Sequence, residues 1–238
     1  MSVLNKYILD EKYIDKFIGI YKKEGDIGRF HAYDWVHNKF EKAILGIEPI
    51  NYDDLALHLY AFLGNWGMLR GSGFLLYLNY KSLVPIVEIV LEAKYRWLLN
   101  IDIDKLIANK EKFIEAVLEL TERIRNVFKG KKYYKFDLDE KVYIDKDINV
   151  SDTFIGKILL STLGCYISCD EYTKKSLKAR GISQNISKKQ AGELVELIKL
   201  NGTMLSKYVS KMTPPATFAN YPVMKILDML LWQEGLYL

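Results

Sequence analysis

Residues 149–182 read NVSDTFIGKILLSTLGCYISCDEYTKKSLKARGI, and this stretch decides the fold expected around it. Asp152 is expected to cap a first helix, because its side-chain oxygen can accept a hydrogen bond from an unpaired backbone N–H of the first turn. The apolar residues of this helix share one face: Ile155, Ile158, Leu159 and Leu163. Gly164 ends the helix. A short segment then leads to a second helix that begins at Asp170, where the helix dipole favours an ionised carboxylate.

Apolar residues recur at helical spacing along the rest of the chain. They predict helices over about 3–23, 29–45, 52–63, 82–99 and 187–212, one or two helices over 103–128, and a last helix that Pro222 opens. The chain is therefore expected to be all-α, with roughly 9–11 helices. We expect one domain over residues 1–238. This domain can be divided into two packed lobes with a cleft between them. One lobe comprises about residues 1–135 plus the C-terminal helix, and the other comprises about residues 149–212.

The composition limits the class of protein before any motif is considered. Half of the 238 residues (50%) are hydrophobic, enough for a sizeable core, and the net charge is +4 with a pI of about 8.7. Cys165 and Cys169 are too few for a disulfide framework, and the N-terminus lacks the apolar core of a signal peptide. No apolar run reaches the roughly 20 residues that span a bilayer. We expect a soluble, cytoplasmic protein without a membrane partner.

Positive charges and aromatic rings alternate between residues 123 and 136. The basic residues occur without an intervening acid: Arg123, Arg125, Lys129, Lys131, Lys132 and Lys135. Tyr133, Tyr134 and Phe136 lie among them, and this combination suits a polyanion whose bases can stack. A solvated loop is the commoner cause of such a run, so both interpretations are kept. Residues 136–148 are expected to form an irregular linker rather than a short hairpin.

Residues 65–74, NWGMLRGSGF, place Trp66 and Arg70 among glycines. Glycines let a backbone approach a ligand closely, and Trp and Arg can both stack on a planar group. The pattern is not a phosphate-binding loop, because it lacks G-x-x-x-x-G-K-[ST] and a preceding strand. Two interpretations stay open: tight helix packing around a core Trp66, or a ligand-facing role for Trp66 or Arg70.

Potential metal ligands are few and poorly spaced. His31 and His37 lie six residues apart, so they point about 120° apart on a helix. Zinc-binding helices instead bring two ligands together at a spacing of four. We therefore expect partly exposed structural histidines, with Asp34 between them, and no metal site. The two cysteines have no nearby His or Cys, which favours small core residues.

The run from Ile158 to Cys165, followed by Asp170 to Gly181, resembles a segment of the helix-hairpin-helix DNA glycosylase superfamily. In that family a helix ends at Leu-Gly, a short extended piece follows, and the catalytic Asp opens the next helix. The similarity covers about 35 residues with one gap. A similarity of this extent is that of a divergent member of the family.

The resemblance implies that Asp170 is the catalytic carboxylate. The family's hairpin falls on about residues 148–153, so Ser151 and Thr153 would contact the DNA backbone, although Asn149-Val150-Ser151-Asp152 replaces the family's Gly-x-Gly. The amine nucleophile of bifunctional members falls at Thr153. Lys157, one turn later, is the alternative amine, and a monofunctional reaction with water is the simpler expectation. The iron–sulfur loop of some members is absent, and no cofactor is expected.

The chemistry of base excision assigns roles to further residues. A fixed carboxylate would stabilise the positive charge that develops on the sugar when an N-glycosidic bond breaks. The nucleotide must leave the stack, and a planar side chain must hold its base: the candidates are Trp66, Arg70 and Tyr172. Double-stranded DNA would be held by cations on its backbone: Lys131, Lys132, Lys174, Lys175 and Lys178.

Two functions of different classes follow. The first is a DNA glycosylase that excises a modified base, for base-excision repair or for defence against phage with modified DNA. The second is a non-catalytic all-α module that binds nucleic acid or a protein, in which Asp170 is only a helix cap.

Overall fold

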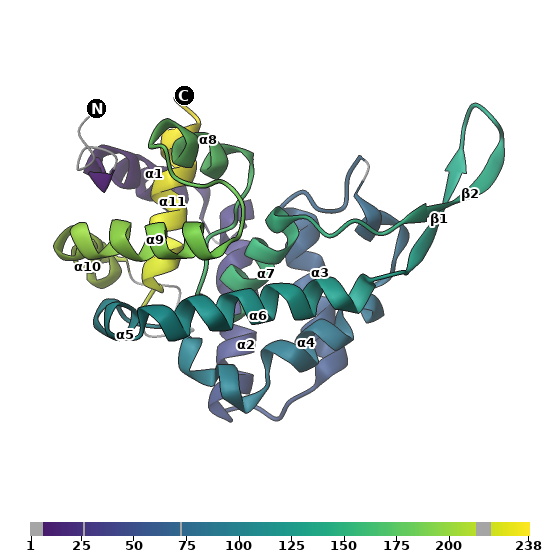
Figure 1. Ribbon diagram of the computed structural model, residues 1–238, viewed down its shortest axis with the longest axis horizontal. Coiled ribbons are helices and arrows are strands. Elements are labelled where there is room, and N and C mark those ends of the chain that lie inside the picture. The colour runs from purple at the N-terminus through teal and green to yellow at the C-terminus, as the bar shows by residue number, and fades with distance from the viewer. Residues whose placement is uncertain (1–6, 26, 72, 213–219) are drawn as a thin grey trace.

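The computed structural model describes residues 7–25, 27–71, 73–212 and 220–238, which form helices and one β-hairpin (Figure 1). The expected all-α class is confirmed. The α-helices are α1 Glu11–Glu24, α2 Ala32–Leu45, α3 Tyr52–Asn65, α4 Val84–Val90, α5 Ile103–Ala108, α6 Lys110–Phe128, α7 Asp152–Leu163, α8 Glu171–Ala179, α9 Lys188–Leu200, α10 Gly202–Lys211 and α11 Val223–Gly235. Short 3-10 helices occupy Arg29–His31, Phe74–Tyr77, Tyr80–Leu83 and Ala93–Leu98. No helix of these ranges is long and apolar enough to cross a membrane.

The C-terminal helix α11 lies at the centre of one group of helices. It packs against α1, α8 and α10, while α7 packs against α2 and α3. The long helix α6 contacts α4 and α5 as well as α9, and it runs across the molecule in Figure 1. Segments from both ends of the sequence are therefore neighbours in space. The division into two lobes stays a prediction.

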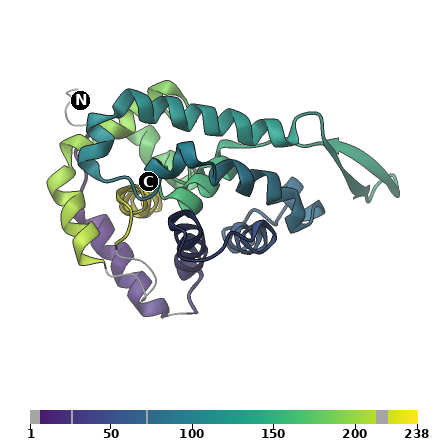
Figure 2. The same cartoon turned by 90° about the horizontal axis from the view of Figure 1, so that it is seen from below.

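A β-hairpin extends away from the helices beyond the end of α6 (Figures 1 and 2). Its strands are β1 Lys132–Asp137 and β2 Val142–Asp147, which pair antiparallel. The irregular linker expected over residues 136–148 is therefore wrong. The strands are held by opposed side chains: Lys132 lies opposite Asp147, and the rings of Phe136 and Tyr143 are 5.2 Å apart. The alternation of residues over 136–148 covers only part of the hairpin, because β1 begins within the basic run.

The helix α7 begins and ends largely as the sequence indicates. Its cap is Ser151 rather than the expected Asp152: the Ser151 hydroxyl accepts a hydrogen bond of 3.2 Å from the backbone N–H of Phe154. The Asp152 carboxylate instead pairs with Arg125 of α6 and accepts a hydrogen bond of 2.9 Å from the backbone N–H of Ile186. Gly164 ends the helix in the left-handed conformation, with φ of 63°.

Several expected helices have different bounds, and residues 103–128 form two helices, α5 and α6. The first begins at Glu11, because Asp10 accepts a hydrogen bond from the backbone N–H of Lys12; the earliest part expected for it lies outside the described residues. The helix expected over 82–99 ends at Val90 and continues as a 3-10 helix after two residues. The helix expected over 187–212 divides at Asn201.

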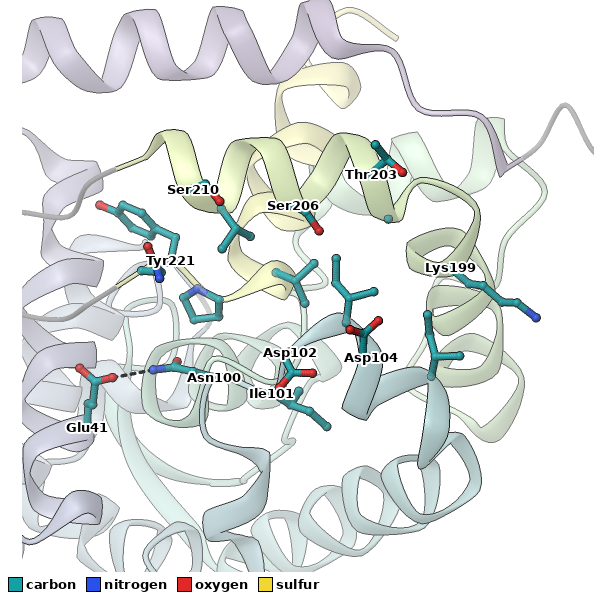
Figure 3. Close-up of a pocket in the computed structure, with 17 residues that line it drawn as sticks. Glu41, Asn100, Ile101, Asp102, Asp104, Lys199, Thr203, Ser206, Ser210 and Tyr221 are labelled. Carbon is teal, nitrogen blue, oxygen red and sulfur yellow. Dashed lines mark hydrogen bonds between the residues drawn. The ribbon is translucent and has the colours of Figure 1, made fainter.

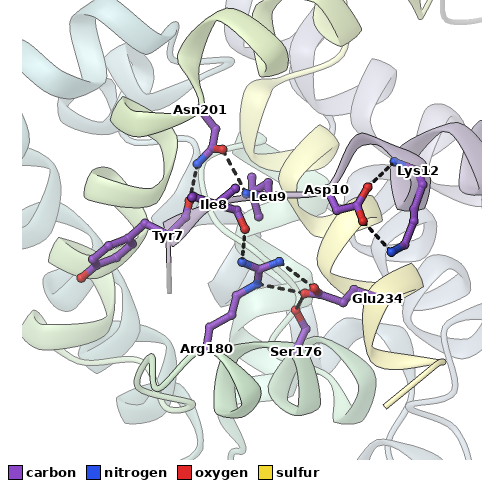
Figure 4. A network of polar contacts seen from close by, with 9 residues as sticks. All are labelled: Tyr7, Ile8, Leu9, Asp10, Lys12, Ser176, Arg180, Asn201 and Glu234. Carbon is purple, nitrogen blue, oxygen red and sulfur yellow. Dashed lines mark hydrogen bonds and ion pairs between the residues drawn. The ribbon is translucent and has the colours of Figure 1, made fainter. Parts of the chain in front are cut away.

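Asn201 explains that division. Its side-chain amide donates hydrogen bonds to the carbonyl oxygens of Leu197 and Tyr7, and its side-chain oxygen accepts one from the backbone N–H of Leu9 (Figure 4). The helix therefore ends where it binds the segment before α1. In the same region Arg180 of α8 forms a buried ion pair with Glu234 of α11 at 2.6 Å (Figure 4).

Candidate functional site

A small pocket brings together residues from α1, α7 and α11, the start of α8, and the turn after α3. It is lined by charged and aromatic side chains: Phe17, Arg29, Phe30, Trp66, Lys157, Asp170, Lys225, Asp228, Met229 and Trp232. Its volume is about 30 Å³, which holds little more than one water molecule. Two lysines and two aspartates line so small a space. Charged groups with little exposure cluster at functional sites, and they also occur in structural ion-pair networks.

A strained backbone segment carries Asp170 into this pocket. Cys169 has φ of 49°, a left-handed conformation that residues other than Gly rarely adopt. Three contacts hold the segment. The backbone N–H of Ser168 donates to Asp228 at 2.7 Å, the hydroxyl of Thr153 donates to the carbonyl oxygen of Cys169 at 2.7 Å, and Gly156 allows a close approach. A Cβ at Gly156 would lie 2.5 Å from the carbonyl oxygen of Ile167.

The carboxylate of Asp170 is both a cap and a pocket group. Its Oδ1 accepts hydrogen bonds of 3.0 Å from the backbone N–H and from the hydroxyl of Thr173. No hydrogen bond from a described residue reaches Oδ2. One oxygen therefore begins α8, as the sequence indicates, and the other is available to a ligand in the pocket.

Lys157 reaches the pocket from α7 and is only 6% exposed. Its ammonium donates a hydrogen bond to the carbonyl oxygen of Trp66 and lies 3.8 Å from the sulfur of Met68. Burial lowers the pKa of Lys157, while the negative charges of Asp170 and Asp228 oppose that shift. The bond to the carbonyl fixes the turn that carries the Trp66 ring.

Lys225 and Asp228 of α11 also line the pocket and were not among the residues predicted for the site. They are 1% and 3% exposed, and burial raises the pKa of Asp228. Their signal is present in VMKILDMLLW: two charged residues three apart share one face of an otherwise apolar helix. A buried helix with two such residues must either pair them or turn them toward a cavity. Both line the pocket.

The three base-pocket candidates lie in different places. Trp66 lines the pocket, and its indole N–H is buried without a hydrogen-bond partner among the described residues. Arg70 is exposed and does not line it; its guanidinium lies over Gly67. Tyr172 lies outside the lining but packs edge-on against Trp232, which belongs to it, with ring centres 5.5 Å apart. Only Trp66 is therefore in direct contact with the pocket.

His31 and His37 are buried rather than partly exposed, which corrects the expectation for these two residues. His31 is 7% exposed and contacts Asp34 at 3.0 Å, and His37 is fully buried between Ser161 and Asn100. Asp34 also accepts a hydrogen bond of 2.6 Å from Tyr221. Within the described ranges no cluster of His, Cys, Asp and Glu could hold a metal ion. Both cysteines are free and buried, as expected of core residues.

The candidate DNA-backbone residues fall into two groups. The hydroxyls of Ser151 and Thr153 are occupied, by the α7 cap and by Cys169 respectively. The lysines lie on two separate elements: Lys174, Lys175 and Lys178 on α8, Lys131 and Lys132 at the start of β1. The hairpin also carries acids that outnumber its lysines: Asp137, Asp139, Glu140, Asp145 and Asp147. The positive surface is therefore better developed on α8.

A larger cavity of about 720 Å³ opens beside α5 and α10 (Figure 3). Carboxylates line it, with Glu41, Asp102 and Asp104 around a space that Lys199 also borders. Figure 3 shows Glu41 accepting a hydrogen bond from Asn100, which is 2.6 Å away. Such a lining repels phosphate. Of the cavity beside α5 and the small pocket at Asp170, the small pocket is the better candidate for an anionic polymer.

Comparisons of this chain with models of known protein families, with characterised proteins and with solved structures each give no match.

Proposed function

We propose that this protein is a DNA N-glycosylase of the helix-hairpin-helix type, which extrudes a modified nucleotide from duplex DNA and hydrolyses its glycosidic bond. The observation that carries the proposal is the meeting of Asp170, Lys157 and Trp66 at one pocket, with Oδ2 of Asp170 left available. The resemblance of residues 158–181 to that family points to the same carboxylate. Base-excision repair and defence against phage with modified DNA are the two settings in the cytoplasm that this activity fits.

The proposed mechanism uses the carboxylate electrostatically. As the bond between C1′ and the base lengthens, positive charge develops on the sugar, and Oδ2 of Asp170 stabilises it. The same oxygen orients the attacking water. Thr173 and the α8 N-terminus hold the carboxylate in place through Oδ1. The Trp66 ring offers a stacking surface, and its unpartnered N–H can donate to an oxygen of the base.

The pocket must open for this reaction. Its present volume of about 30 Å³ is far smaller than a nucleobase. Arg29 is exposed and Phe30 is half-buried, and both come from a 3-10 helix at the pocket wall. We propose that these two side chains rotate away from Trp232 to enlarge the pocket. Extrusion of the base adds a cost of its own, which is lowest for a damaged or poorly paired base and therefore favours modified DNA.

The test is excision by the purified protein on duplexes that each carry one modified base. Released base is detected by mass spectrometry, and abasic sites are detected by alkali cleavage. Asp170→Asn is expected to abolish release, because Asn caps a helix as well as Asp but carries no charge. The matched control is Asp102→Asn. Asp102 caps α5 in the same way, because its carboxylate accepts a hydrogen bond of 2.8 Å from the backbone N–H of Lys105. Full excision by Asp170→Asn would show that the mechanism is wrong.

A non-catalytic nucleic-acid or protein-binding module is the second candidate, and the small volume of the pocket favours it. In that case Asp170 is a cap alone. The same experiment separates the two functions: salt-sensitive binding to DNA without release of any base supports the module.

A further inference from the structure

The β-hairpin has one face that is anchored to the helical part of the protein and one face that is not. On the anchored face the ring of Tyr133 stacks on that of Tyr77 from a 3-10 helix, with ring centres 4.9 Å apart. Successive side chains of a strand point to opposite faces, so the next residue, Tyr134, lies on the other face. Tyr134 is 71% exposed. This second face is therefore open to solvent.

Two further aromatic rings share the open face with Tyr134. Phe136 lies two residues further along β1, and Tyr143 of β2 lies directly opposite Phe136. These two rings meet edge-on, and they are 41% and 73% exposed. Leu138, in the turn after β1, is 82% exposed. We call these four residues the hairpin patch, and a contiguous exposed patch of this kind marks an interaction surface.

The size of the hairpin patch suits a small protein–protein interface. A large apolar side chain presents about 150–250 Å² when fully free, so the four side chains offer on the order of 500 Å² at their observed exposures. Two such patches that cover each other bury about 1,000 Å², near the lower limit for a specific interface. Burial also stabilises the hairpin, because a two-stranded sheet without a covered apolar face is only marginally stable.

The charges along the hairpin complement those of a second hairpin. Lys129 and Lys131 lie at its base, next to the end of α6, whereas Asp139 and Glu140 lie at its tip. Two hairpins packed antiparallel about a two-fold axis bring the base of each to the tip of the other. Unlike charges then meet at both ends of the interface. A parallel arrangement brings like charges together instead.

Carboxylates beside the hairpin patch disfavour a nucleic acid as its occupant. Asp145 lies directly opposite Tyr134 and therefore shares its face, and Asp147 lies opposite Lys132. Together with the acids at the tip, these groups repel phosphate. Exposed rings alone suit the stacking of bases, but a base cannot reach these rings without bringing its phosphate close to the acids.

We propose that the hairpin patch is an interface between two copies of this chain, in which the hairpins pack antiparallel about a two-fold axis. Tyr134, Phe136 and Tyr143 of one copy then pack against the same three residues of the other. The small area makes this a reversible dimer. The proposal does not rest on the proposed function, because no residue that lines the pocket at Asp170 belongs to the hairpin.

The first test is sedimentation velocity of the intact protein over two decades of micromolar concentration, where a reversible monomer–dimer equilibrium is expected. Tyr134→Ser combined with Tyr143→Ser is expected to raise the Kd of the dimer at least about tenfold. The matched control combines Trp35→Ser with Tyr52→Ser, which removes exposed rings from α2 and α3 and should leave the Kd unchanged. A protein that stays monomeric throughout overturns the proposal, as does an equal loss in both double variants.

Charge reversal tests the antiparallel arrangement without touching the aromatic rings or a cross-strand pair. One variant reverses the base, Lys129→Glu with Lys131→Glu, and the other reverses the tip, Asp139→Lys with Glu140→Lys. Each alone places like charges at both ends of its own dimer, so its Kd at low salt should rise about tenfold. An equal mixture of the two variants should dimerise again, because unlike charges then meet. A mixture that stays monomeric overturns the proposal.

A nucleic acid as the true occupant is a separate outcome. Fluorescence anisotropy with a labelled single-stranded oligonucleotide measures whether the hairpin patch binds it. We expect Tyr134→Ser combined with Tyr143→Ser to leave any such binding unchanged. If monomeric protein binds the oligonucleotide and this double variant does not, the patch is a base-stacking surface and the proposed dimer is wrong.

Discussion

The carboxylate of Asp228 accepts a hydrogen bond of 2.7 Å from the backbone N–H of Ser168, and this bond joins α11 to the segment that ends at Asp170. Ser168 is fully buried, so its N–H has no access to water if the acceptor is removed. Asp228→Ala is expected to lower the free energy of unfolding by about 1–3 kcal/mol. Asp228→Asn keeps an acceptor oxygen and should lose less. Urea denaturation of both variants measures the difference, and equal losses would show that the bond itself contributes little.

Gly156 is expected to be intolerant of any side chain. A Cβ there would lie 2.5 Å from the carbonyl oxygen of Ile167, so Gly156→Ala must push the segment before Asp170 away from α7. We expect a loss of about 1–3 kcal/mol in stability. Gly192→Ala in α9 is the matched control, since its Cβ would meet Ile114 at an ordinary 3.8 Å. That change should add about 0.5–1 kcal/mol, because Ala is the better helix former. A neutral Gly156→Ala protein would contradict the close approach.

Stability is expected to rise with pH between about 8 and 9.5 because of Lys225. The pKa of Lys225 in the folded protein is about 8, which is below its value in the unfolded chain. Below pH 8 the folded and the unfolded protein therefore both bind the proton, and the full cost of the buried charge destabilises the folded protein. Above pH 8 the unfolded chain binds more protons, and stability rises by up to about 1.4 kcal/mol per pH unit. The reverse slope begins near pH 10, where buried tyrosines with raised pKa, such as Tyr21, keep protons that the unfolded chain loses. Lys225→Met should flatten the rise in a series of urea titrations.

The ion pair of Arg180 and Glu234 is expected to be important for stability because it is buried. The side chains are 9% and 13% exposed, and the guanidinium makes hydrogen bonds of 2.9 Å and 2.6 Å to the carboxylate. Arg180→Met leaves Glu234 without this partner and should cost about 3–5 kcal/mol. The exposed pair of Lys207 and Glu11 is the control, and Lys207→Met should change the melting temperature little. Similar losses in both variants would contradict the role of burial.

DNA binding is expected to depend on α8 more than on the hairpin. Few acidic residues lie near the α8 lysines, Lys174, Lys175 and Lys178. More acidic residues lie near Lys131 and Lys132, and Lys132 lies opposite Asp147 in the hairpin. Replacing the α8 lysines with Ala should reduce the slope of log K against log salt by up to about 0.9 for each phosphate that is no longer neutralised. Replacing Lys131 and Lys132 should reduce it less. Fluorescence anisotropy at several salt concentrations measures both slopes, and the opposite order would place the DNA on the hairpin.

The sequence predicted the elements that local chemistry determines. Asp170 begins α8 and Gly164 ends α7 as expected. Predictions from neighbouring residues alone were wrong where a contact with a residue distant in the sequence determines a helix boundary. Asp152 could have capped α7, but Arg125 and Ile186 take its carboxylate, and Asn201 divides a helix because it binds Tyr7.

The candidate site was predictable only in part for a similar reason. Asp170 stood out because it opens a helix, and Trp66 because it lies among glycines. Lys225 and Asp228 lie in a helix whose remaining residues are apolar, and their meaning depends on what faces them. Apolar periodicity places α11 in the core but does not show which neighbours surround each position, so the pocket could not be assembled from the sequence.

The rings of Phe17 in α1 and Trp232 in α11 meet edge-on at 6.0 Å on the wall of the pocket, so the site joins segments that a ribosome makes early and late. A nascent chain that lacks α11 has neither Lys225 nor Asp228 and holds Asp170 without its anchor. The pocket is therefore complete only once synthesis has passed α11.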